Sequence, residues 1–254
     1  MEQLIRRRLL EIEKTEHVRI LFAAESGSRA WGFPSPDSDY DVRFVYVRPE
    51  TAYLKLEGIR DVIECPIQDA LDINGWDLQK ALRLLFRSNP TVFEWASSPL
   101  VYLETGSAER FRGLMPEYFS PGKSLYHYLS MAEQNQRAYL QGDLVRAKKY
   151  FYVLRPVLAC RWILERNTPP PMLFSELAAG MLPACLKDPV DDLLALKTRS
   201  PEVREIPRID VLHAFLDEEL PRIRDAASRT QTHREQDWSR LNAFFLDVLG
   251  RTDL

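Results

Sequence analysis

The most constraining feature of this chain is a run near its N-terminus that joins two strands through a Gly-Ser turn and ends in paired acids. Residues 18–26, VRILFAAES, have the length and the apolar content of a buried strand. Gly27 and Ser28 follow, and the glycine and prolines of residues 32–36 then require a loop. Residues 40–47, YDVRFVYV, are rich in β-branched and aromatic residues and predict a second strand. The chain therefore begins with a sheet.

Further along, the pattern changes from strand to helix. Residues 60–67 and 69–73 predict two more strands, and the apolar positions after Gly75 recur at helical spacing. From about residue 106 the chain is helical in character, with periodic segments at 123–140, 143–165, 189–198, 208–228 and 234–249. We predict an α+β fold. A small mixed β-sheet with flanking helices forms a catalytic domain over 1–100, and an all-helical domain over 101–254 completes the substrate cleft.

Composition excludes several classes of protein. The net charge of -3 and the pI of about 5.9 argue against strong non-specific binding to nucleic acid. No window approaches the roughly 20 apolar residues of a membrane span, and the basic N-terminus lacks the apolar core of a secretory signal. The three cysteines are scattered without a CxxC pair. We therefore expect free thiols, a cytoplasmic location and no membrane partner.

The paired acids suggest a metal. Side chains two residues apart in a strand point to the same face, so Asp39 and Asp41 would lie side by side and repel each other. A divalent cation removes that conflict. Mg²⁺ prefers hard oxygen ligands and usually takes one or two carboxylates together with substrate phosphates.

The Gly-Ser turn suggests a phosphate. A turn of this kind after a buried strand, opening a short helix, presents backbone N–H groups and the Ser28 hydroxyl to an anion. Either motif alone is usually an ordinary turn or a solvated strand edge. In this order and at this spacing, they predict a site for a nucleoside triphosphate.

These residues resemble a known family. Strand, Gly-Ser, short helix, loop and Asp-x-Asp is the signature of the polymerase-beta-like nucleotidyltransferase superfamily. The run GSRAWGFPSPDSDYDVRFVY is similar to its bacterial and phage branch, predicted nucleotidyltransferases that are associated with RNA ligase and RNA repair operons. GWDLQKALRLLFRSNPTVFEW and KKYFYVLRPVLACRWI are similar to the same branch, and the likeness covers residues from about 17 to 225.

The resemblance implies three catalytic, metal-binding carboxylates, two from Asp-x-Asp and one from a later strand. Asp39 and Asp41 match the first two. For the third we choose Asp72, because a strand position lets it point at the pair. The alternatives are Glu64 on the adjacent strand, Asp69, and Asp77, which is better explained as a first-turn acid on a helix.

The implied reaction is attack of a hydroxyl on the α-phosphate of an NTP, such as ATP, with release of pyrophosphate. Two Mg²⁺ or Mn²⁺ ions would be held by Asp39 and Asp41, and Asp72 would hold the one that activates the hydroxyl. Gly27, Ser28 and Arg29 would bind the phosphates.

Further substrate contacts are less specific. Lys80 on the helix after Gly75 can reach the site or be solvated. Lys148, Tyr152 and Arg155 share one face of a helix, where an aromatic ring between two cations can stack on a base; snorkelling cations that cover the core are the alternative. The simplest interpretation of Trp31 in the loop is a core residue, and a side chain that stacks on a base is the alternative.

The acceptor stays open. An RNA 3′ end is one candidate, a protein hydroxyl, as in AMPylators of the superfamily, is another, and a non-catalytic nucleotide-binding module is a third. By resemblance alone, an RNA ligase is a candidate partner.

Overall fold

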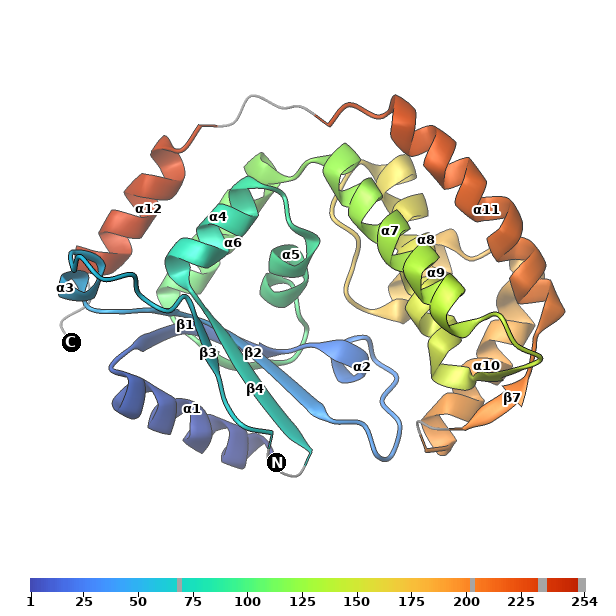
Figure 1. The fold of residues 1–254 in the computed structure, drawn as a ribbon, viewed down its shortest axis with the longest axis horizontal. Coiled ribbons are helices and arrows are strands. Elements are labelled where there is room, and N and C mark those ends of the chain that lie inside the picture. The colour runs from blue at the N-terminus through green and yellow to red at the C-terminus, as the bar shows by residue number, and fades with distance from the viewer. Residues whose placement is uncertain (68–69, 202–203, 233–236, 251–254) are drawn as a thin grey trace. The chain divides into compact units, whose positions relative to one another are not determined.

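A computed structural model describes residues 1–67, 70–201, 204–232 and 237–250 (Figure 1). The chain forms two compact units. The first unit contains Met1–Gly27, Asp39–Tyr118 and the described part of Glu235–Leu254. The second contains Ser28–Ser38 and the described part of Phe119–Arg234. The division at residue 100 into a catalytic domain and a helical domain that completes the substrate cleft stays a prediction.

The first unit is built on a five-stranded sheet with strand order β3-β4-β2-β1-β5. The strands are β1 (Arg19–Glu25), β2 (Tyr40–Val47), β3 (Val62–Glu64), β4 (Leu71–Asp77) and β5 (Val101–Glu104). β2 and β4 are parallel and the other pairs are antiparallel. The expected small mixed sheet is therefore confirmed, with β2 at its centre.

Helices cover both faces of this sheet (Figure 1). The helices of this unit are α1 (Glu2–Glu16), α3 (Glu50–Tyr53), α4 (Leu78–Phe86), α5 (Pro90–Ala96), α6 (Gly106–Tyr118) and α12 (Ser239–Gly250), and the short α2 (Gly27–Ala30) begins at the last residue of the unit's first segment. α1 lies on one face, where its buried stripe of Ile5, Leu9 and Ile12 faces the strands. α4, α5 and α6 lie on the other face.

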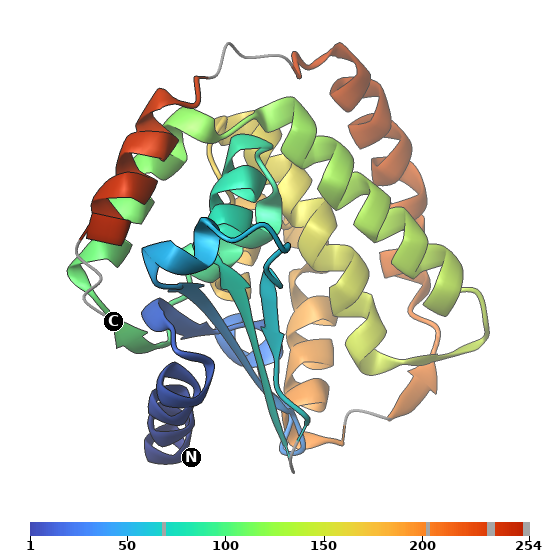
Figure 2. The ribbon, with the colours of Figure 1, turned by 60° about the vertical axis from the view of Figure 1, so that its left-hand side comes forward.

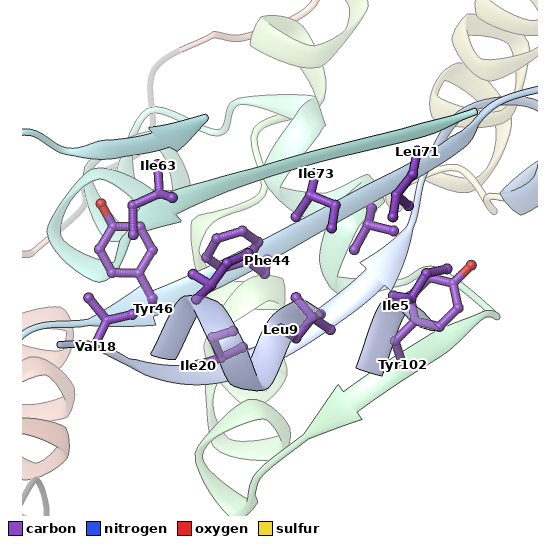
Figure 3. Close-up of a cluster of buried hydrophobic side chains, with 13 residues drawn as sticks. Ile5, Leu9, Val18, Ile20, Phe44, Tyr46, Ile63, Leu71, Ile73 and Tyr102 are labelled. Atoms are coloured by element: carbon purple, nitrogen blue, oxygen red, sulfur yellow. The ribbon is translucent and has the colours of Figure 1, made fainter. Parts of the chain in front are cut away.

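The core under α1 combines aliphatic and aromatic side chains (Figure 3). Phe44 of β2 is fully buried there, and its ring lies directly over Gly75 of β4. A Cβ at position 75 would be 2.2 Å from that ring. Gly75 is therefore a strand glycine that makes room for a neighbouring aromatic side chain.

The last helix returns to the first unit. α12 runs beside α6 (Figure 2), and Phe244 of α12 packs against Phe111 of α6 with ring centroids 6.1 Å apart. Trp238, just before α12, stacks on Phe86 of α4 at 3.8 Å. Residues more than a hundred positions apart in sequence thus share one core.

The second unit is mainly helical. It contains α7 (Pro121–Tyr139), α8 (Ala147–Arg166), α9 (Phe174–Met181), the 3-10 turn η1 (Ala184–Leu186), α10 (Lys187–Arg199), α11 (Asp210–Arg229) and the strand pair β6 (Leu144–Arg146) and β7 (Glu205–Pro207). α8 packs against α7, α9, α10 and α11, so it forms the centre of this unit. The described part of the chain contains no helix long and apolar enough to cross a membrane.

The loop of residues 28–38 is anchored in this second unit. Phe33 is 2% exposed and packs against Phe151 and Phe174, with ring centroids 4.7 and 5.3 Å away. The buried Lys197 ammonium donates to the Phe33 carbonyl at 2.8 Å and to the Ser35 hydroxyl at 3.0 Å. Aromatic packing and a buried cation therefore fix the loop.

Several predicted boundaries were wrong. β4 continues to Asp77, although a strand was predicted only to residue 73. The helix predicted over 143–165 begins instead as β6, because Leu144–Arg146 pairs with Glu205–Pro207. β5 was not predicted from the sequence.

Candidate active site

Two of the predicted acids face each other across the central strand pair. In the parallel register of β2 and β4, Asp41 lies directly opposite Asp72. Residues opposite each other on neighbouring strands point to the same face of the sheet. Their side chains are 31% and 29% exposed, so both are partly shielded from water.

Arg43 joins these two carboxylates. It follows Asp41 by two residues in β2, so it points to the same face. Its guanidinium donates to Asp41 Oδ1 at 3.2 Å and to Asp72 Oδ2 at 2.7 Å. It also donates to the backbone carbonyls of Val42 at 3.1 Å and Asp72 at 3.0 Å. The chain itself therefore supplies a positive charge between the acids.

Sequence reasoning missed Arg43. The signal was present, because the same spacing of two that linked Asp39 with Asp41 also links Asp41 with Arg43. The prediction was that the compensating charge comes from a metal ion.

A buried glutamate holds the backbone of Asp41. Glu25, at the end of β1, is fully buried, and its Oε1 accepts the Asp41 backbone N–H at 2.7 Å. The Tyr102 hydroxyl of β5 donates to the other oxygen of Glu25. The Ser26 N–H donates to the Asp41 carbonyl at 2.8 Å. Hydrogen bonds with Glu25 at the end of β1 and with the adjacent Ser26 thus fix the backbone of Asp41.

Gly27 makes room for the Asp41 side chain. Its φ is +61°, in the left-handed region that favours glycine. A Cβ at this position would lie 2.1 Å from Asp41 Oδ2. The glycine predicted to approach a phosphate is therefore also required by the Asp41 side chain next to it.

The carboxylates of Asp39 and Asp41 are the kind of ligand that a hard cation prefers. Mg²⁺ usually takes one or two carboxylates plus substrate phosphates, and Asp39 and Asp41 supply that number. Asp39 is exposed and lies one residue before β2. Among the described residues, however, no group of three or more His, Cys, Asp or Glu side chains is arranged to hold a metal ion. Metal binding by Asp72 as a third ligand stays a prediction.

The alternatives to Asp72 have other surroundings. Asp77 is buried at the N-terminus of α4, where it accepts the Gln79 N–H at 2.8 Å and the Tyr53 hydroxyl at 2.8 Å. Its burial raises the pKa of this carboxyl above its ordinary value. Glu64 is exposed on β3 and pairs with Arg60 at 2.8 Å. Asp69 lies outside the described residues.

The predicted phosphate-binding side chains Ser28 and Arg29 belong to the second unit. The Ser28 hydroxyl is 3.1 Å from that of Ser38, and the Arg29 guanidinium donates to the Ser38 carbonyl at 2.7 Å. These contacts hold the two ends of the 28–38 loop together.

The remaining candidates fall into two groups. Lys80, on α4 of the first unit, pairs with Asp61 at 3.2 Å. Tyr152 and Arg155, on α8 of the second unit, line a pocket together with Trp31 and Lys149. Lys148 is half-buried on the same helix. A role for any of these residues in binding substrate stays a prediction.

Two known proteins are similar to this chain. The chain is 48% identical to the uncharacterized protein YcgL of Bacillus subtilis (strain 168) over 251 residues, which is 98% of this chain and 96% of that protein. A crystal structure of a nucleotidyltransferase-like protein from Exiguobacterium sibiricum 255-15 is similar with a TM-score of 0.33 and 13% identity, covering 100% of this chain and 81% of that one.

A family model decides the assignment. The model named RlaP, described as the RNA repair pathway DNA polymerase beta family, matches residues 1–247, nearly the whole chain. The match includes the Gly-Ser turn, the Asp-x-Asp strand and all of the second unit that the structure describes. The chain therefore belongs to the RNA repair pathway DNA polymerase beta family, whose members are nucleotidyltransferases.

Proposed function

We propose that this protein is a metal-dependent nucleotidyltransferase that transfers a nucleoside monophosphate from an NTP to a hydroxyl group, with an RNA 3′ end as the acceptor. One observation carries the proposal. Asp41 and Asp72 lie opposite each other on parallel strands and share one guanidinium. When two acids face each other beside an attacking hydroxyl, one can bind the metal while the other accepts the proton.

Each residue has a role in this proposal. Asp39 and Asp41 hold a magnesium or manganese ion, which when bound polarises the α-phosphate and neutralises its charge. Asp72 accepts the proton of the attacking hydroxyl. Arg43 keeps Asp72 oriented through its hydrogen bond of 2.7 Å.

The triphosphate needs its own contacts. The Gly27 backbone and the side chains of Ser28 and Arg29 follow β1 directly and bind the β- and γ-phosphates in this proposal. The new bond joins the acceptor oxygen to the α-phosphorus. The bond from that phosphorus to the bridging oxygen of pyrophosphate breaks, and pyrophosphate leaves with its electron pair.

The test uses NTPs labelled in the α-phosphate, Mg²⁺ or Mn²⁺, and a panel of RNA 3′ ends. Wild-type protein should label RNA, and Asp39→Ala and Asp41→Ala should each reduce labelling by at least about a thousandfold, as for loss of a metal-holding group. Asp37→Ala removes a neighbouring exposed carboxylate and serves as the matched control.

The alternatives give different results in the same experiment. Labelling of protein without labelling of RNA would replace the RNA acceptor by a protein one. Binding of NTP without any labelling would leave a non-catalytic nucleotide-binding module. Full activity of either acid variant would contradict the assignment of the site.

A further inference from the structure

A pocket of about 250 Å³ lies entirely within the second unit. Met131 and Asn135 of α7 form one wall, and Lys149, Tyr152 and Arg155 of α8 form another. Trp31, from the 28–38 loop, completes it. The pocket, which Phe151 also lines, therefore combines three aromatic rings with two cations.

The aromatic rings are held at fixed angles. Trp31 and Tyr152 meet edge to face, with ring centroids 5.8 Å apart and planes at 84°. The Arg155 guanidinium lies over the Trp31 ring at 4.8 Å, and this arginine is only 3% exposed. A buried, planar cation on an indole is a rigid surface on which another flat ring can stack.

The second cation is also held by rings. The Lys149 ammonium lies 3.5 Å from the centroid of Tyr139 and 4.7 Å from that of Tyr152. Unlike Arg155, Lys149 is half-buried, so its charge is accessible at the edge of the pocket. An anionic group bound beside Tyr152 would meet this charge.

One buried polar atom adds a further indication. The indole Nε1 of Trp31 is buried and has no hydrogen-bond partner among the described residues. Such buried donors are uncommon in native proteins and call for an explanation. This donor belongs to one of the rings that line the pocket.

We propose that this pocket binds a nucleobase against Tyr152, with the attached phosphate on Lys149. The volume lies just below the roughly 300–1,000 Å³ of ordinary small-molecule sites, which favours one flat base over a complete nucleoside triphosphate. The cation at its edge suits the phosphate that every nucleotide carries. The biological role of this pocket rests on the proposed function, but binding to the pocket can be measured without catalysis.

The test measures binding in EDTA, where no transfer occurs. A short, fluorescently labelled single-stranded RNA is titrated by anisotropy, and ATP by calorimetry. Tyr152→Leu should weaken binding about tenfold, the usual cost of losing one stacked base. Tyr126→Leu, which changes a tyrosine on α7 that is 46% exposed, is the matched control and should bind as the wild type does.

Salt dependence separates stacking from charge. Lys149→Ala should reduce the slope of log affinity against log salt by about 0.7 for RNA, as expected for one lost phosphate contact, whereas Tyr152→Leu should leave the slope unchanged. Arg166→Ala removes one exposed charge near the other end of α8 and should leave both affinity and slope unchanged.

The two ligands identify the source of the base. Weaker binding of RNA alone supports a pocket for an RNA residue, and weaker binding of ATP alone supports a pocket for the free nucleotide. The pocket is refuted if the wild type binds neither ligand, if Tyr152→Leu binds both like the wild type, or if the controls lose as much affinity. Transfer by the wild type that is lost in Asp41→Ala would leave the proposed function standing in each case.

Discussion

Arg43 explains how two acids can share one face of the sheet before any metal binds. Without it, the carboxylates of Asp41 and Asp72, which are opposite each other in the register of β2 and β4, would repel each other with only solvent to screen them. The guanidinium contacts both carboxylates and two backbone carbonyls, and is only 17% exposed. A metal ion bound to these acids would then compete with an internal counter-charge.

Arg43→Ala should therefore destabilise the protein in the absence of metal. We expect a loss of about 1–2 kcal/mol in the free energy of unfolding, from charged hydrogen bonds that are partly screened by solvent. Added Mn²⁺ should recover part of that loss, because a cation can replace the missing charge. Thermal unfolding in EDTA and in Mn²⁺ measures both effects.

Arg60→Ala is the matched control, since it breaks an ion pair with Glu64 in which both side chains are more than half exposed. That loss should stay below about 1 kcal/mol and should not respond to Mn²⁺. Equal behaviour of the two arginine variants would contradict the role given to Arg43.

At this scale, the sequence predicts types of residue better than their partners. Asp72 lies in a strand beside the acid pair, as predicted, and pairs with Asp41, whereas its role as the third carboxylate stays a prediction. The register itself could not be predicted, because it depends on which strands pair. The spacing of two places Arg43 on the face of Asp41, but its contact with Asp72 joins residues 29 positions apart and depends on the same register.

At the scale of elements, the junction of β4 and α4 shows how one side chain can end a strand and begin a helix. Asp77 is the last residue of β4 and the N-cap of α4. Tyr53 of α3 donates to its carboxylate and accepts the Arg48 N–H at 3.0 Å, which ties the end of β2 to the same point. The carboxylate is 1% exposed, and burial raises its pKa despite these hydrogen bonds.

This raised pKa gives a pH-dependent stability. The folded state holds the Asp77 proton more tightly than the unfolded state does. The protonated carboxyl therefore contributes fully to stability below the ordinary pKa of 3.8, and this contribution is lost as pH rises through the pKa of the folded state. Asp77→Asn keeps a good N-cap without the buried charge. The unfolding temperature of this variant should exceed that of the wild type at about pH 8, and by a smaller difference at about pH 5.

Thermal unfolding of both proteins across this range is the measurement. Asp225→Asn, in an ion pair whose side chains are mostly exposed, is the control and should follow the wild type at each pH. A difference between Asp77→Asn and wild type that grows toward acid would contradict the argument.

The same junction shows which elements a pattern can predict. β2 was predicted with its observed bounds because its β-branched and aromatic residues are typical of a strand along its whole length. β4 was cut short at residue 73, since Gly75 resembles a break; only the neighbouring Phe44 ring shows why a glycine belongs inside that strand. β5 and β6 have four and three residues and depend on distant partners, so their local sequence carries little signal.

At the scale of the whole molecule, the chain order matters as much as the fold. The chain leaves the first unit at Gly27, returns at Asp39, leaves again after Tyr118 and comes back for α12. The last helix contributes Leu241, Phe244 and Val248 to the buried core of that unit. The stability of the N-terminal sheet therefore depends on the far end of the chain.

Phe244→Ala tests this dependence. Removing a phenyl ring that is 5% exposed should cost about 3–5 kcal/mol and lower the unfolding temperature by roughly 10 °C. Hydrogen exchange should accelerate in α4 and α6 of the first unit. Leu246→Ala, on the same helix but 64% exposed, should change the unfolding temperature by less than about 2 °C. An equal effect of the two variants would mean that α12 does not stabilise the sheet.

The position of α12 also has a consequence during protein synthesis. Roughly 120 residues separate the end of α6 from the start of α12, and at roughly 5–20 residues per second a ribosome needs roughly 6–24 s to translate them. Throughout that interval the nascent chain has made Phe86 and Phe111 but not the Trp238 and Phe244 that cover them. We expect this aromatic face to be the part of the newborn protein that chaperones bind, and to be released when the final helix emerges.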